Sequence, residues 1–77
     1  MAPTPEQLRA VLVEILSDST TKPEAHWRTV IGSVTKRPSA TEARSNWEIS
    51  PTGSDYDCAA AARAMEIVRR EHPYVGD

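Results

Sequence analysis

The sequence has little of what usually marks a secreted domain or a nucleotide-binding enzyme. Its 77 residues include one cysteine, three glycines and no phenylalanine. Because Cys58 is alone, it cannot close an intramolecular disulfide, the usual cross-link of small secreted domains. Gly32, Gly53 and Gly76 are too scattered to form a phosphate-binding loop. These absences argue against both classes of protein.

Long apolar runs are also missing. No stretch approaches the roughly 20 apolar residues that a membrane span requires. The start, Met1-Ala2-Pro3, is not followed by the basic and apolar segments of a signal peptide. With 39% hydrophobic residues and a net charge of −2, the composition is that of a globular protein and not of a disordered one. We therefore expect a cytoplasmic protein that does not enter a membrane.

The length of the chain limits both domain count and stability. We predict a single small domain over residues 1–77. Large apolar side chains are few, and at roughly 25 cal/mol per Å² their burial nearly cancels the conformational entropy lost on folding. Stability should therefore be low, and association with another chain is a common supplement at this size.

The clearest predicted element is an N-terminal helix. Thr4 can cap it, Pro5 suits the first helical position, and Gln7 can bond back to the amide of the cap. The apolar residues that follow share one helical face: Leu8, Val11, Leu12, Ile15 and Leu16. The polar run after Ser17 and then Pro23 predict the end of the helix near Ser17.

Residues 26–35 are predicted to form a strand because five of their side chains are β-branched. An alternative stays open, since Trp27, Val30, Ile31 and Val34 also have helical spacing behind a proline. In the strand, Gly32 would mark a bulge. Periodicity permits the helix, and residue propensity favours the strand.

The second half of the chain predicts a short strand and another helix. Trp47-Glu48-Ile49 alternates, with Trp47 and Ile49 expected to point inward. Ser54 is a good cap for a helix that Pro73 stops near residue 71 or 72. The predicted packing face of that helix comprises Tyr56, Ala60, Ala61, Ala64, Ile67 and Val68.

The predicted fold class is therefore α+β, with two helices packed on a short antiparallel β-hairpin (αββα). Two strands alone are marginal, so a third short strand near Tyr74 and Val75, or a sheet shared by two chains, stays open. Trp27 and Trp47 are the largest apolar groups, and we expect them in the core. The alternative is that their rings stack on nucleotides.

We predict no catalytic, cofactor-binding or metal-binding residues. Cys58 lies in the first turn of a helix, but Asp55 and Asp57 beside it oppose a thiolate. His26 and His72 belong to no metal-ligand spacing. No serine lies in a G-x-S-x-G turn. We therefore expect that the protein is not an enzyme and has no cofactor.

Charge is distributed unevenly along the chain. Residues 22–44 carry a net charge of +3, whereas the segments before and after them are acidic. This basic segment is either a partner-facing surface or a means of attraction between the hairpin and the helices. The candidate partner-binding residues are Arg28, Lys36, Arg37 and Arg44.

Three stretches of the sequence resemble a pattern in small uncharacterised bacterial proteins. They read WRxVIG from Trp27, SNWxIxPxG from Ser45, and HPYV from His72. The resemblance implies no activity, fold or site.

Two functional hypotheses follow from the sequence. The first is a protein-interaction module, with self-association open, that uses the hairpin edge or the connection from Lys36 to Arg44. The alternative is a nucleic-acid-binding protein that uses residues 22–44. The acidic isoelectric point, near 5.6, counts against the alternative because nucleic-acid-binding domains are usually basic.

Overall fold

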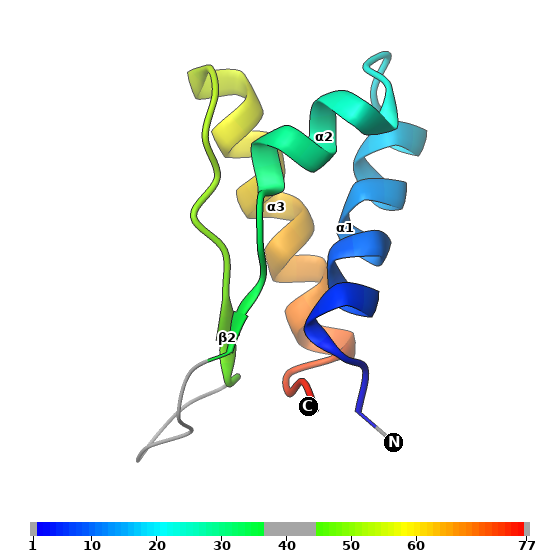
Figure 1. Cartoon of the computed structure of the whole chain (residues 1–77). Coiled ribbons are helices and arrows are strands. Elements are labelled where there is room, and N and C mark those ends of the chain that lie inside the picture. Colours follow the sequence, from blue (N-terminus) through cyan, green and yellow to red (C-terminus); the bar gives the residue numbers. More distant parts are fainter. Residues whose placement is uncertain (1, 37–44, 77) are drawn as a thin grey trace.

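The computed structural model describes residues 2–36 and 45–76 of the chain. Five elements follow one another, and Figure 1 shows their arrangement. They are α1 (Pro5–Ser19), α2 (Glu24–Ile31), β1 (Thr35–Lys36), β2 (Trp47–Glu48) and α3 (Asp55–Glu71). The α+β class is confirmed, but the order is helix, helix, strand, strand, helix.

The N-terminal helix α1 begins as predicted. Thr4 accepts a hydrogen bond from the Gln7 amide at 3.1 Å, and the Gln7 side chain accepts one from the Thr4 amide at 2.9 Å. The helix ends at Ser19, two residues later than expected. There the hydroxyls of Ser19 and Thr20 donate to carbonyls one turn earlier, so the polar run lengthens the helix before it ends. The buried face comprises Leu8, Leu12, Val13 and Leu16.

The predicted strand over residues 26–35 is wrong, because residues Glu24–Ile31 form the helix α2. Its buried face carries Trp27, Val30 and Ile31, at helical spacing. Burial of such side chains is worth about 1.5–3 kcal/mol each. The helix penalty of β-branched residues is at most about 0.7 kcal/mol each. Burial on one face therefore outweighs the local preference for a strand.

Gly32 ends α2 and forms no bulge. Its φ of +65° lies in the region that favours glycine, and its amide donates to the Arg28 carbonyl at 3.0 Å. The chain then turns into the hairpin, in which Thr35 pairs with Glu48 and Lys36 pairs with Trp47. The glycine therefore separates the helix from the strand that follows it.

The hairpin is short, and its inward side chains are the predicted ones. The second strand is Trp47–Glu48, and both Trp47 and Ile49 are buried. Tyr74 and Val75 form no third strand in the described part of the chain. Instead the Asn46 side chain accepts a hydrogen bond from the Val75 amide at 2.7 Å and donates one to the Val75 carbonyl at 3.1 Å. One asparagine thus ties the C-terminal segment to the hairpin.

The helix α3 has its predicted ends, but part of its predicted packing face is exposed. The Ser54 hydroxyl accepts from the Asp57 amide at 3.1 Å, and the helix stops at Glu71 before Pro73. Ala61, Ala64 and Val68 face the core as expected. Tyr56 and Ile67, predicted on the same face, are 60% and 50% exposed. The fully buried apolar residues of this helix are thus Ala61, Ala64 and Val68, and Met65 packs against the core while partly exposed.

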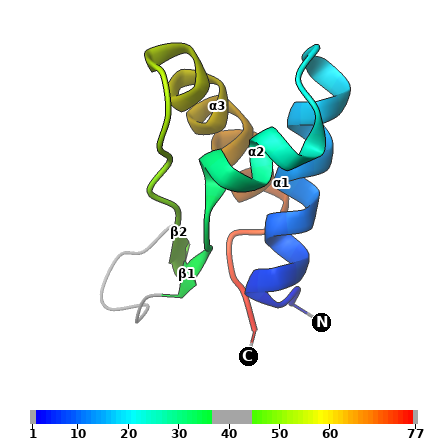
Figure 2. The same cartoon turned by 45° about the horizontal axis from the view of Figure 1, so that its top comes forward.

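The three helices and the hairpin enclose one apolar core. Helices α1 and α3 lie side by side, and α2 crosses them near one end (Figure 1). The hairpin continues from α2 beside α3, and the two termini lie at the opposite end from α2 (Figure 2). Trp27 and Trp47 are 0% and 2% exposed, which confirms that both indoles belong to the core. Among residues 2–36 and 45–76, no helix has the length and apolar character to cross a bilayer.

Candidate functional site

Two of the four predicted partner-binding bases, Arg28 and Lys36, lie in the described part of the chain. Arg28 lies on the exposed side of α2 and pairs with Glu24 at 3.3 Å, one turn earlier. Lys36 is an exposed residue of β1. Arg37 and Arg44 lie outside the described residues. Both described candidates are exposed, and their role in binding a partner stays a prediction.

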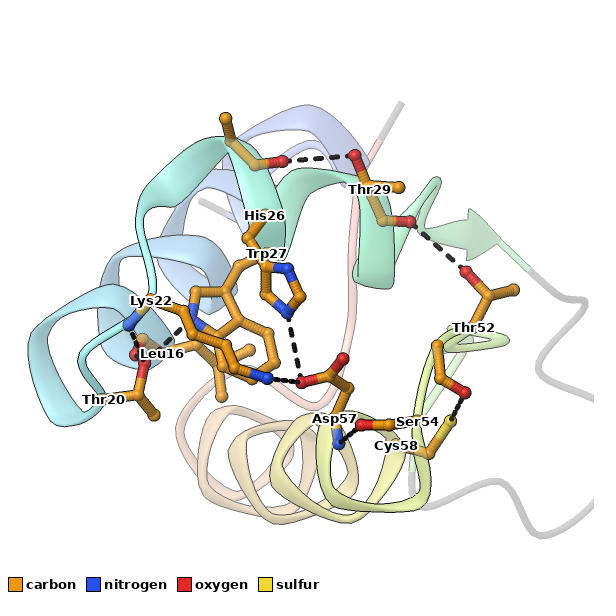
Figure 3. A network of polar contacts seen from close by, with 12 residues as sticks. Leu16, Thr20, Lys22, His26, Trp27, Thr29, Thr52, Ser54, Asp57 and Cys58 are labelled. Atoms are coloured by element: carbon orange, nitrogen blue, oxygen red, sulfur yellow. Dashed lines mark hydrogen bonds and ion pairs between the residues drawn. The ribbon is translucent and has the colours of Figure 1, made fainter.

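The most concentrated polar group surrounds Asp57 at the start of α3 (Figure 3). Its side chain is 6% exposed, and Oδ1 accepts a hydrogen bond from Lys22 Nζ at 2.7 Å. His26 Nε2 lies 3.1 Å from the same oxygen. Lys22 comes from the turn between α1 and α2, and His26 comes from α2. The group therefore joins the turn, α2 and α3.

The charge of Asp57 is well stabilised. The Lys22 hydrogen bond, aided by His26, outweighs the opposing effect of desolvation and holds the pKa of the Asp57 carboxyl well below its usual range. A carboxylate held in this way stays ionised near neutral pH and is a poor proton acceptor. We therefore infer that Asp57, Lys22 and His26 have a structural role and hold α3 against α2 and the turn that precedes it. No three His, Cys, Asp or Glu side chains of the described residues are placed to hold a metal ion.

The polar atoms of both indoles have internal partners. Trp27 Nε1 donates to Thr20 Oγ1 at 2.9 Å, and Trp47 Nε1 donates to the His72 carbonyl at 2.9 Å. The Arg69 guanidinium lies over the Trp47 ring, with Cζ 5.1 Å from its centroid, and donates to the Trp47 carbonyl. Buried rings held in this way are not available to stack on nucleotides. The stacking alternative is therefore wrong.

An apolar groove of about 410 Å³ runs between α1 and α3, and we call it the α1/α3 groove. Its α3 side is mostly apolar, its α1 side combines two apolar residues with two hydroxyl side chains, and no residue of α2 or the hairpin lines it. The lining residues are Ile15, Leu16, Ser19, Thr20, Tyr56, Ala59, Ala60, Arg63, Ala64 and Ile67. The two exposed large side chains of α3, Tyr56 and Ile67, stand at its ends.

Two further hollows are polar. One of about 690 Å³ lies beside Trp47 and combines Glu48 and Glu66 with Arg69 and Arg70. The other, about 480 Å³, lies between α1 and α2 and is lined by acids together with Arg9 and Arg28. Arg9 donates to the Arg28 carbonyl at 3.2 Å. Both hollows thus combine charges of opposite sign.

Sequence reasoning missed the α1/α3 groove and the buried Asp57. A signal for the groove was present, because Tyr56 and Ile67 are eleven residues apart, three turns of a helix. Their exposure depends on how closely α1 approaches, which the helical pattern does not specify. In the sequence Asp57 stood out as an acid beside Cys58. Its burial depends on Lys22, which is 35 residues away in the chain.

Comparison with known proteins found no match to this chain among protein-family models, curated proteins or solved structures.

Proposed function

We propose that the protein is a non-enzymatic protein-interaction module whose partner presents an apolar helix to the α1/α3 groove. The observation that carries the proposal is the exposure of Tyr56 and Ile67, at 60% and 50%, along one groove. Large apolar side chains that are exposed along one groove make it a candidate interaction site.

The shape of the groove favours a helix as the bound element. The groove lies between the antiparallel helices α1 and α3, and the small residues Ala59 and Ala60 lie between Tyr56 and Ile67 along α3, so a helix could lie against this surface. Recognition of an amphipathic helix in such a groove uses anchors at positions i, i+3 or i+4, and i+7. The proposal differs from the sequence hypothesis in its surface, because it uses the two long helices and not the hairpin edge.

Selection from a peptide library tests this proposal. Helical peptides of about 18 residues, roughly five turns, are displayed and selected against the full chain. We expect enrichment of peptides with one apolar face. Binding should be at least about tenfold weaker to the Ile67→Asp variant, a loss of about 1.4 kcal/mol. Ala62→Asp, which adds the same charge on the exposed side of α3 outside the groove, should bind as well as the wild type.

Either of two results would contradict the proposal. One is that no apolar helix is enriched. The other is that the enriched peptides bind the wild type and Ile67→Asp equally well, since they would then use another surface. Circular dichroism of both variants confirms that they are folded before binding is compared.

Nucleic-acid binding through residues 22–44 stays a prediction. Lys22 and Arg28, two of its cations, are paired with Asp57 and Glu24. Titration with single- and double-stranded DNA and RNA at about 50 mM salt tests it, because phosphate contacts are strong at low salt. Absence of binding under these conditions would remove this alternative.

A further inference from the structure

The side of α3 that faces the groove has the residue spacing of a helix that packs along a second helix, and we call these residues the α3 stripe. Tyr56, Ala60, Arg63 and Ile67 follow one another at intervals of four, three and four residues. This alternation keeps side chains on one stripe that faces a second helix over its length. All four residues line the α1/α3 groove. The stripe therefore fits an elongated helical partner better than a compact ligand.

The stripe is complementary to itself when two copies run antiparallel. Tyr56 then lies opposite Ile67 of the second copy, so the two exposed apolar groups cover each other. Ala60 lies opposite Arg63 of the second copy, and the small methyl leaves room for the aliphatic stem of the arginine. A parallel pair would instead place Arg63 against its own copy, and like charges in contact repel. The sequence of the stripe thus favours the antiparallel arrangement.

Charges at the two ends of α3 favour the same arrangement. Asp55 lies in the first turn and Arg70 in the last, and both are exposed. Around the helix they are separated by about 60°, on the same flank of the stripe. In an antiparallel pair the acidic end of each α3 meets the basic end of the other, at two symmetric places. The two helix dipoles are also opposed.

We propose that the α1/α3 groove binds a second copy of this chain, with the two α3 helices packed antiparallel about a two-fold axis. This inference rests on the proposed function and names its partner. The helix of 17 residues is about 25 Å long, so the interface belongs to the small class typical of weak complexes. The dimer therefore dissociates on dilution and forms at high concentration.

Sedimentation equilibrium of the full chain tests the inference. Under reducing conditions, which prevent oxidation of Cys58, the mass should rise above the 8.5 kDa monomer toward twice that value. The range to cover is about 10 µM to 1 mM, where weak interfaces associate. Ile67→Asp should raise the dissociation constant at least about tenfold, and Ala62→Asp should leave it unchanged.

Charge reversal tests the antiparallel arrangement separately. Asp55→Lys and Arg70→Glu should each weaken the dimer, because each places like charges together at both ends. The double variant should restore association, because the charges are then exchanged and still opposite. Both positions are exposed, so this set does not depend on a change in the core.

Three results would overturn the inference. The first is a wild-type mass that stays at that of the monomer over the whole concentration range. The second is equal association of the wild type and Ile67→Asp. The third is a double charge variant that associates no better than either single variant, which would exclude the antiparallel pairing. If a strict monomer still selects apolar helices from the peptide library, the proposed function stands and its partner is another protein.

Discussion

The two long helices differ in how deeply their large apolar side chains are buried. In α1 the leucines are buried, and Leu8 and Leu12 are 0% exposed. In α3 the buried positions hold small side chains such as Ala61 and Ala64, whereas Tyr56 and Ile67 are exposed. The leucines of α1 are thus covered by the chain itself, although Ile15 is only partly buried and lines the α1/α3 groove. The stripe of α3 that carries Tyr56 and Ile67 stays exposed, and we propose that another molecule covers it.

Neighbouring residues of α3 provide the strongest test of this difference. Val68 is 1% exposed and Ile67 is 50% exposed. Val68→Asp should cost more than about 4 kcal/mol, because an unpaired charge enters the core. That is most of the stability of a small domain, so we expect an unfolded chain by circular dichroism. A folded Val68→Asp variant would show that this face of α3 is not part of an essential core.

The stability of the buried core also depends on Trp27. Trp27→Phe removes the hydrogen bond to Thr20 and part of the ring volume, and we expect a loss of about 1–3 kcal/mol in urea unfolding. Tyr56→Phe is the matched control on the open stripe. It should change stability by less than about 0.5 kcal/mol in the monomer. Equal losses for the two variants would contradict the distinction between the closed and open faces.

The ion pairs at the start of α3 predict a pH dependence of stability. The pKa of Asp57 is depressed in the folded protein, chiefly by the Lys22 hydrogen bond, so the ionised carboxylate stabilises the fold. This contribution is present above the ordinary aspartate pKa, about 3.9, and is lost as pH falls below it toward the folded-state pKa. Asp57→Asn lacks it.

Urea unfolding of the wild type and Asp57→Asn between pH 2 and pH 7, which spans the ordinary carboxylate range, measures this contribution. We expect the wild type to be more stable at pH 7 and the difference to shrink below about pH 4. Lys22→Met should show the same trend, since it removes the main partner of the carboxylate. A difference that is the same at every pH would show that the charge of Asp57 does not stabilise the fold.

The smallest expected change in stability is for a substitution in the exposed stripe of α3. Ile67→Asp should change the free energy of unfolding of the monomer by less than about 1 kcal/mol, because the side chain is already half exposed. Urea unfolding at low protein concentration measures it. A loss as large as that of Val68→Asp would mean that Ile67 belongs to the core and that the stripe is not open.

The elements that the sequence predicted correctly are those with local signals. The capping box at Thr4 and Gln7, the Ser54 cap and the stop before Pro73 depend on residues close in the chain. The helix α2 was missed because its signal is tertiary. Its β-branched residues favour a strand, and only burial of Trp27, Val30 and Ile31 against the other helices reverses the preference.

The α1/α3 groove could not be predicted from the sequence, because it also depends on tertiary contacts. The basic residues stood out in the charge pattern, yet Lys22 and Arg28 are engaged with Asp57 and Glu24. Helical periodicity grouped Tyr56 and Ile67 with Ala61 and Val68 on one packing face. Which part of so wide a face is covered depends on the distance and angle between helices, and those are set by contacts far apart in the chain.

We propose that the exposed stripe of α3 is covered only when two chains associate. Thermal unfolding at two protein concentrations, about a hundredfold apart, measures this directly, since association of folded chains makes the midpoint depend on concentration. We predict that the wild-type midpoint rises by about 4 °C or more and that the Ile67→Asp midpoint does not move. Midpoints that are independent of concentration for both proteins would contradict the account.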